Sequence, residues 1–358
     1  MKIKFLYKWT TTLPLLASLL YVSGVIHNSP VWQILACLLL VGSVLSAVHH
    51  SEIIAHRVGE PYGTIILAIS ITIIEVAVII SLMISGGNEA SSLARDTVYA
   101  ACMLILNGIV GLCLFIGGYK YHEQVFSPQS VTIALVSLIS IIVFTLILPS
   151  FTKSVSGPYY NPSQLLFASF SCLVIYTAFI FAQTIRHREY FISKTTQSSE
   201  IPKTAVSKKA FFTSFIFLVI SLSVVVLLAK TLSPRIEEII LDYHLPKALV
   251  GIIIATIILL PEGIAAVNAA RSNRLQTSLN LALGSALASI GLTIPVVSVI
   301  AHYYKMKIEL GLDYLSMILL MLSVLTVMLS LNSGRSNIVY GTVLLINLIA
   351  FGYLIVYP

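Results

Sequence analysis

Charged residues are scarce in this chain. Asp, Glu, Lys and Arg make up 10% of its 358 residues, hydrophobic residues make up 58%, and the mean hydropathy is +0.97. A soluble domain averages about 25% charged residues, so the composition excludes an ordinary soluble protein. The net charge of +7 does not indicate nucleic-acid binding, because the basic residues gather in short loops between apolar stretches, where they set membrane topology.

Cysteine is also rare, and its placement excludes two kinds of site. None of the four cysteines has CxxC spacing or a histidine partner in sequence, and all lie within apolar stretches: Cys37, Cys102, Cys113 and Cys172. We read them as small hydrophobic residues with no disulfide or metal role, and we expect no cofactor. The chain also lacks HExxH, a GxSxG elbow and paired intramembrane aspartates, which argues against an intramembrane enzyme.

Long apolar segments are abundant. About 20 apolar residues cross a bilayer as a helix, and eleven segments meet this rule: 13–27, 31–50, 61–86, 97–118, 130–150, 164–185, 210–230, 246–270, 277–302, 311–331 and 337–357. The sequence therefore predicts an all-α polytopic membrane protein. The first segment follows three lysines and resembles a signal peptide, but no A-x-A site follows it, so we expect residues 1–30 to hold an uncleaved helix.

The loops predict an orientation and a repeat. With eleven spans, the amino-terminal side collects about twice as many lysines and arginines as the other side, which predicts a cytoplasmic amino terminus and an external carboxyl terminus in the cell inner membrane. Residues 187–209, rich in Ser, Thr and Lys, then form a cytoplasmic linker. Five helices lie on each side, in residues 31–186 and 210–358. Because five is odd, the halves form an inverted repeat, with a binding site expected near the membrane midplane.

Two glutamates stand alone in apolar segments. Glu75 lies in residues 61–86 and Glu262 in residues 248–270, and neither segment holds another charged residue. An ionisable group near the bilayer centre costs roughly 2.5–3.5 kcal/mol on insertion scales, and such groups mark ion or proton paths. Each glutamate is in the second helix of its half. We therefore predict that both carboxylates bind the transported cation and proton; the alternative is a pair of glutamates hydrogen-bonded inside a bundle with no transport role.

The helix after each glutamate carries small and polar residues. Ser285, Ser289 and Thr293 recur every four residues and share a face, with Asn280 on a neighbouring stripe; in the first half Asn107, Gly111 and Gly118 lie on one face. Small residues allow close helix approach, and hydroxyls and amides hydrogen-bond across it. These faces therefore either pack helices or supply neutral oxygens to a cation.

The chemistry of these residues suits a hard cation in competition with protons. Carboxylate and carbonyl oxygens bind Ca²⁺ and Na⁺, while burial and a second carboxyl raise a carboxyl pKa. Cation and proton would then compete for the same oxygens, which suffices for exchange if the site faces one side at a time. Pro261 removes one helix hydrogen bond, so we expect either a helix break that frees a carbonyl or a simple kink.

A polar cluster lies between the second and third predicted helices. It could form a cytoplasmic access path or a pH sensor, because histidine titrates near neutral pH; the alternative is a solvated loop. Its members are His50, Glu52, His56 and Glu60.

The glutamate segments resemble a known family. HRVGEPYGTIILAISITIIEVAVIISLM (residues 56–83) and LPEGIAAVNAARSNRLQTSLNLALGSALASIGLTIP (residues 260–295) resemble the ChaA-type calcium/proton antiporters, in the cation/proton exchanger branch of the calcium:cation antiporter superfamily. The resemblance implies an extra helix plus two inverted five-helix bundles and alternating access. It assigns the motif glutamates to Glu75 and Glu262, and the small-polar motif to Asn107 and Ser285.

The chain departs from that family at two positions. Many members carry Asn three residues before each motif glutamate, where this chain has Thr72 and Leu259. The second position thus lacks a neutral ligand, which leaves room for Na⁺ or K⁺ beside Ca²⁺. Thr72, Thr256 and Asn280 are candidate replacements.

Several functions remain open from the sequence. The leading prediction is a secondary antiporter that exports Ca²⁺, and also Na⁺ and K⁺, against H⁺. Its expected partners are membrane lipid and the transported ions, with no nucleic acid and no fixed oligomeric state. The alternatives are Na⁺/Ca²⁺ exchange on the same fold, an intramembrane enzyme, and a channel, which the single carboxyl in each half weakly opposes.

Overall fold

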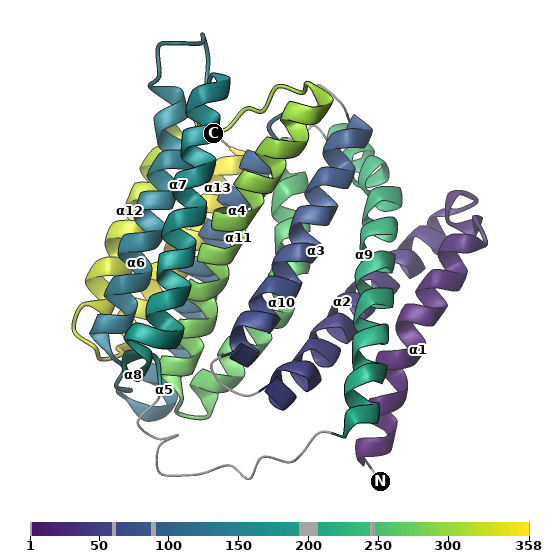
Figure 1. The fold of residues 1–358 in the computed structure, drawn as a ribbon, viewed down its shortest axis with the longest axis horizontal. Helices are drawn as coiled ribbons and strands as arrows, with labels where there is room; N and C mark the ends of the chain where they lie inside the picture. Colours follow the sequence, from purple (N-terminus) through teal and green to yellow (C-terminus); the bar gives the residue numbers. More distant parts are fainter. Residues whose placement is uncertain are drawn as a thin grey trace. The chain divides into compact units, whose positions relative to one another are not determined.

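The computed structural model describes residues 2–58, 62–86, 91–192, 207–243, 246 and 248–357 (Figure 1). Within these ranges the fold is all-helical, and its only β-type pairing is an isolated bridge between Val125 and Arg335. The long helices fall at the eleven predicted places. In chain order they are α1 (Lys2–Val22), α2 (Pro30–Val58), α3 (Tyr62–Gly86), α4 (Leu93–Met103) with α5 (Val110–Tyr121), α6 (Pro128–Ile142), α7 (Pro162–Phe181), α9 (Lys208–Asp242), α10 (Ala248–Arg271), α11 (Leu275–Tyr304), α12 (Tyr314–Leu331) and α13 (Ile338–Val356).

Short irregular segments complete the helices. A 3₁₀ turn, η1 (Val25–His27), follows α1, and the helix α8 (Arg188–Phe191) follows α7. Three segments are π-helical: η3 (Leu104–Ile109) between α4 and α5, η4 (Val143–Ile147) after α6, and η6 (Ala182–Arg186) after α7; η5 (Leu148–Ser150) is 3₁₀. Segments of π-helix inside α-helices are rare and frequently mark functional sites.

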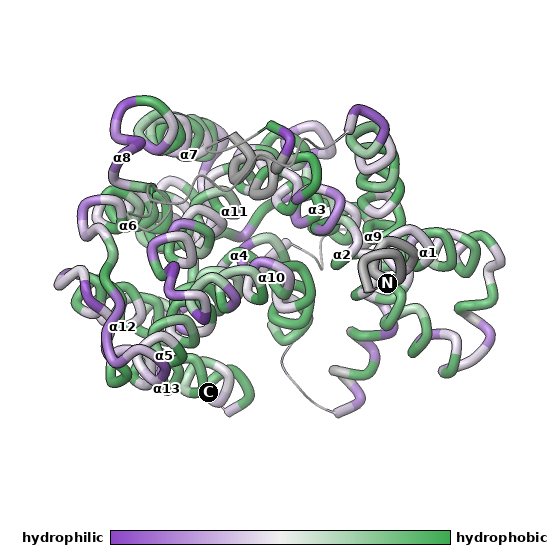
Figure 2. The backbone as a smooth tube through the Cα atoms, turned by 90° about the horizontal axis from the view of Figure 1, so that it is seen from below, coloured by the Kyte–Doolittle hydropathy of each residue, from purple (hydrophilic) through white to green (hydrophobic). Residues whose placement is uncertain are grey.

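The helices are long and apolar enough to cross a membrane. Among the described residues nine helices meet this standard, and Trp9–Val22 and Ile69–Ile84 form two shorter apolar helices. The hydropathy-coloured tube shows apolar helix bodies with hydrophilic residues mainly at their ends and in the turns (Figure 2). The multi-pass prediction is therefore confirmed.

Three predicted helices have wrong boundaries. The first helix begins at Lys2 and ends at Val22 rather than covering 13–27, α2 continues to Val58 rather than ending near 50, and α9 continues to Asp242 rather than ending near 230. The extensions have one cause: an apolar window finds the part of a helix that fits the hydrocarbon layer, whereas helical hydrogen bonding continues into polar sequence beyond it. The first helix ends early because Gly24, just after it, adopts a left-handed φ of 68°.

The chain forms two compact units that do not follow the predicted halves. Unit 1 contains Met1–Ser85 and Pro202–Val250, and unit 2 contains Gly86–Ile201 and Gly251–Pro358. Each unit combines segments from both halves.

In unit 1, α2 packs along α9, and α1 packs against both. A buried serine joins all three: the hydroxyl of Ser46 donates to the carbonyl of Thr10 and lies 3.2 Å from the hydroxyl of Ser221. Near one end of the pair, the Arg57 guanidinium lies 5.1 Å from the ring centre of Phe211. The first helix of each predicted half thus pairs with the other.

In unit 2 the packing between the predicted halves is reciprocal. The third helix of the second half, α11, packs against α6 and α7, the fourth and fifth helices of the first half. Correspondingly, η3 packs against α12 and both η3 and α5 pack against α13, the fourth and fifth helices of the second half. Such an exchange is the pattern that two repeats related by two-fold symmetry would produce.

Glycines set the approach of α5 to α13. A Cβ atom added at Gly341 would lie 2.3 Å from the backbone nitrogen of Phe115, and one added at Gly118 would lie 2.6 Å from that of Ile338. A Cβ atom at Gly111 would meet Leu344 at 2.9 Å. For Gly111 and Gly118 the packing interpretation of the small-residue face is therefore correct.

Candidate cation-binding site

Glu262 lies on α10 and is 6% exposed. The hydroxyl of Ser285, on α11, donates a hydrogen bond to its carboxylate. The chain reverses between the two helices, where Asn273 adopts a left-handed φ of 57°. Glu262 lies nine residues before the end of α10 and Ser285 ten residues after the start of α11, so both are about 14–15 Å from the turn. Antiparallel packing brings them to the same level.

This contact gives the buried carboxylate a polar partner. A buried charged group is costly unless hydrogen bonds or an opposite charge compensate it. The same hydroxyl oxygen keeps lone pairs that a cation could use. The sequence placed Ser285 in the helix that follows Glu262, and the structure brings the two side chains together; a role for Ser285 as a cation ligand stays a prediction.

The hydroxyl face of α11 continues along the helix from Ser285 to Ser289 and Thr293. Ser289 is 1% exposed and Thr293 fully buried, and the Thr293 hydroxyl has no hydrogen-bond partner among the residues that the structure describes. The three predicted hydroxyls therefore all lie within the protein rather than toward its surface.

Asn107 lies in the π-helical segment η3 and is fully buried. Its amide nitrogen donates to the hydroxyl of Ser323 on α12 at 2.8 Å. Ser323 in turn donates to the carbonyl of Leu319 at 2.7 Å, so its oxygen is the acceptor for Asn107 and the orientation of the amide is fixed. The amide oxygen of Asn107 then has no hydrogen-bond partner among the described residues. A buried acceptor without a donor is suited to a cation or water.

This arrangement predicts different outcomes for Asn107 and its partner. If the free oxygen binds the cation, Asn107→Leu should raise the KM for the transported cation about tenfold, since one lost polar contact costs ~1–1.5 kcal/mol. Ser323→Ala keeps that oxygen but removes the acceptor that orients the amide, so it should raise KM less than Asn107→Leu does. Steady-state exchange in proteoliposomes measures both. Equal KM changes in the two variants would show that Asn107 only holds helices together.

Two predicted replacement ligands have other roles in the structure. The amide nitrogen of Asn280 donates to the carbonyl of Phe191 at 2.6 Å, and its oxygen accepts from Gln276 at 2.7 Å, so it anchors α8 to α11. The hydroxyl of Thr256 donates to the carbonyl of Ile252 at 2.7 Å, and the residue lines an apolar groove. At about 100° per residue, Thr256 and Glu262 lie on different faces of α10, as Asn280 and Ser285 do on α11.

The predicted helix break at Pro261 is wrong. Helix α10 continues through Pro261, which is buried, as far as Arg271. Pro261 still has no N–H to donate, and a membrane helix tolerates this because neighbouring groups satisfy the freed carbonyl. Leu259, at the position where the family often has Asn, is buried and has no polar side-chain atom.

Glu75 lies on α3, in unit 1, and is 3% exposed. Thr72, three residues earlier, is on the same helix face and 5% exposed. The structure therefore keeps a buried carboxyl and a buried hydroxyl together on α3, as the sequence indicates. Glu262 belongs to unit 2.

The part of the polar cluster that the structure describes is helical rather than a loop. Residues 50–58 continue α2, and His50 is 1% exposed, with its ring stacked on Phe217 of α9 at 5.5 Å between centroids. A solvated loop is therefore wrong for His50. Glu52 is half-buried on α2. The side chain of His56 and all of Glu60 lie outside the described residues, and the access or pH-sensing role stays a prediction.

Sequence reasoning did not identify Ser323. It is one of several hydroxyl residues in the apolar helix α12, so nothing in the local pattern separates it from serines that bond to their own helix. Only the packing of α12 on η3 reveals its contact with Asn107.

Comparison with known proteins agrees with this arrangement. Residues 28–185 and 213–357 match the family described as sodium/calcium exchanger protein. The chain is 41% identical over 339 residues to y4hA of Sinorhizobium fredii, an ionic transporter by name, covering 94% of this chain and 92% of that one. It is 31% identical over 312 residues to the sodium-potassium/proton antiporter ChaA of Escherichia coli, covering 86% and 84%.

Solved structures share the fold at low sequence identity. The H⁺/Ca²⁺ exchanger CAX superposes with a TM-score of 0.74 at 16% identity, covering 98% of this chain and 88% of that chain. YfkE superposes with a TM-score of 0.72 at 18% identity, covering 98% and 100%. The chain therefore belongs to the sodium/calcium exchanger protein family, as a cation/proton exchanger of the calcium:cation antiporter superfamily.

Proposed function

We propose that this protein exports Ca²⁺, and also Na⁺ and K⁺, in exchange for H⁺ by alternating access. Cation and proton compete for the carboxylates of Glu75 and Glu262. The observation that carries the proposal is the buried contact between Glu262 and Ser285, in a helix span whose interior has no other charged side chain. A buried carboxylate beside a hydroxyl can either take a proton or join a cation site.

The range of cations follows from the oxygens available around Glu262. The Leu259 side chain supplies none, the Thr256 hydroxyl donates to a carbonyl of its own helix, and Asn280 links α11 to α8. A site with few fixed neutral oxygens discriminates weakly between divalent and monovalent cations, since selectivity depends on ligand number and cavity size. The name of the relative ChaA, a sodium-potassium/proton antiporter, supports Na⁺ and K⁺ beside Ca²⁺.

The second candidate is Na⁺/Ca²⁺ exchange on the same fold. The family description that this chain matches names both ions. Such a protein would bind Na⁺ at sites of its own beside the carboxylates, and the sequence contains no obvious set of ligands for them. Its distinguishing property is Ca²⁺ movement driven by a Na⁺ gradient when no proton gradient is present.

Everted membrane vesicles test the proposal directly. A respiration-driven proton gradient is read with a pH-sensitive dye, and Ca²⁺, Na⁺ or K⁺ is then added separately. We expect each cation to dissipate the gradient, with Ca²⁺ effective at the lowest concentration because two positive charges interact more strongly with carboxylates. Vesicles without the protein are the control. A Ca²⁺ flux that requires Na⁺ and leaves the proton gradient intact would instead establish the second candidate.

A further inference from the structure

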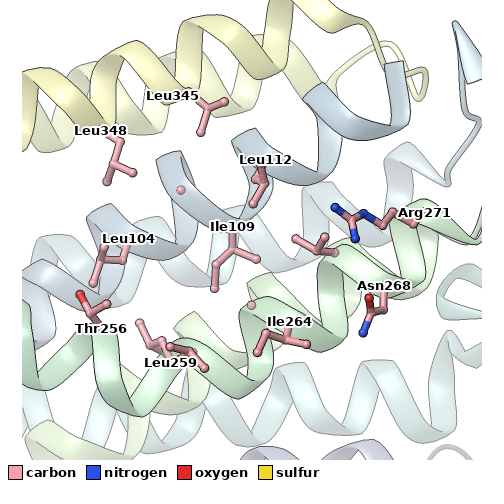
Figure 3. A pocket seen from close by; sticks show the side chains of 14 residues that line it. Leu104, Ile109, Leu112, Thr256, Leu259, Ile264, Asn268, Arg271, Leu345 and Leu348 are labelled. Atoms are coloured by element: carbon pink, nitrogen blue, oxygen red, sulfur yellow. The ribbon is translucent and has the colours of Figure 1, made fainter. Parts of the chain in front are cut away.

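An apolar groove runs along α10 within unit 2 (Figure 3). Its volume is about 450 Å³, within the range of roughly 300–1,000 Å³ typical of sites for small organic ligands. The walls come from α10, from the helix that comprises α4, η3 and α5, and from α13. Leu112, Leu260 and Ile264 on these walls are 37–48% exposed, so the groove is open along its side.

The two ends of the groove differ in chemistry. Thr256 lies at one end, and Asn268 and Arg271 lie at the other (Figure 3). Among the residues that the structure describes, those between the two ends are aliphatic or glycine, and no aspartate or glutamate lines the groove. From Thr256 to Arg271 the helix rises about 22 Å, more than half of the hydrocarbon core of about 30 Å. The groove therefore has one long apolar part and one polar, cationic end.

The structure describes no carboxylate that pairs with the cationic end of the groove. Among the described residues no acidic side chain pairs with the guanidinium of Arg271, and the nearby Glu123 already pairs with Arg335 at 3.2 Å. The Lys120 ammonium donates to the backbone carbonyl of Arg271 at 2.9 Å, which adds a second positive charge there. Asn268 contributes an exposed amide.

We propose that this groove binds an anionic phospholipid, with its phosphate at Arg271 and Asn268 and an acyl chain along Leu260 and Ile264. Arginine binds phosphate through two parallel hydrogen bonds. The apolar part of the groove accommodates a lipid acyl chain, which would otherwise pack against an irregular protein surface. The positive end and the lack of acidic lining select an anionic headgroup over a zwitterionic one. The lipid would lie against α10 beside Gly263, the residue after Glu262, and this site does not depend on the proposed transport activity.

Native mass spectrometry of the full chain in detergent tests the site. We add phosphatidylglycerol or phosphatidylcholine and expect wild-type protein to retain the first at least about tenfold better, the gain from one charge-assisted phosphate contact. Arg271→Gln should lose this preference, because its backbone contacts remain while the charge is removed. Arg271→Lys should keep part of it. Arg274→Gln, an exposed arginine that does not line the groove, is the matched control and should behave like wild type.

A second variant tests the apolar part with the charge intact. Ile264→Trp fills the open side of the groove and should reduce retention of phosphatidylglycerol at least as much as Arg271→Gln. Equal retention in wild type and Arg271→Gln, or equal loss in Arg274→Gln, would overturn the proposal. It would also fail if inorganic phosphate alone raised the melting temperature as much as phosphatidylglycerol, because the groove would then bind a free anion and no acyl chain.

Discussion

Glu262→Gln is expected to abolish cation-dependent proton exchange while leaving the protein folded. Glutamine keeps the shape of the side chain and can still bond to Ser285, but it carries neither the negative charge nor a titratable proton. Removing one partner of a buried charge pair costs ~3–5 kcal/mol, which corresponds to at least a 100-fold loss of cation affinity. Exchange in everted vesicles and size-exclusion chromatography of the purified variant measure the two parts of this expectation.

The controls separate the site from general charge effects. Glu238→Gln removes a carboxylate that is exposed and paired with Arg235, and its exchange rate should equal that of wild type. Ser285→Ala keeps the carboxylate but removes its donor, so we expect a weaker cation affinity and residual exchange. Saturable exchange in Glu262→Gln at wild-type rates would reject the assignment of this glutamate as a transport residue.

Glu75→Gln extends the same reasoning to the first half. Glu75 is as deeply buried as Glu262, and the hydroxyl residue Thr72 lies buried on the same helix face as Glu75. If both carboxylates take part in transport, either single substitution should abolish exchange. Activity in Glu75→Gln but not in Glu262→Gln would show that one carboxylate carries both ions.

Features of the fold and the site can be predicted from the sequence when they depend on interactions between residues close together in the chain. The helices could be predicted because a segment that crosses the hydrocarbon layer of a membrane needs about 20 apolar residues. Its backbone N–H and C=O groups must also hydrogen-bond to each other. Glu75 and Glu262 stand out in the sequence as candidate transport residues because a lone charge in such a segment costs free energy, and their role stays a prediction. The contact between Ser285 and Glu262 could be anticipated, because a short turn between antiparallel helices fixes which of their residues lie at the same height.

Contacts between distant helices were beyond prediction. Asn107 meets Ser323, 216 residues later, and no local pattern encodes that distance. The sequence equally allowed Asn280 and Thr256 as ligands, because a polar residue near a glutamate can bond to its own helix, to a neighbour or to an ion. The two compact units also differ from the predicted halves, since packing in unit 2 pairs helices of one half with helices of the other.

The largest expected effect on folding is at Gly341, on α13. Gly341→Ala should lower the free energy of unfolding by at least ~2–3 kcal/mol, the upper range for overpacking. The added Cβ would lie 2.3 Å from the nitrogen and 2.6 Å from the Cα of Phe115, and 2.7 Å from the carbonyl oxygen of Gly111. All three are backbone atoms, so no rotamer change relieves the clash and α5 must move away from α13.

Gly352→Ala is the matched control, because it makes the same substitution on the same helix. A Cβ atom there meets nothing within 4 Å, and alanine favours a helix over glycine by up to ~1 kcal/mol. The two variants should therefore shift the melting temperature of the purified protein in opposite directions. Moving an apolar helix from lipid into contact with another helix brings no hydrophobic free energy, because lipid tails are equally apolar. Helix association therefore depends on close packing and interhelical hydrogen bonds. Equal melting temperatures for the two variants would mean that α5 and α13 do not approach as closely as the glycine contacts require.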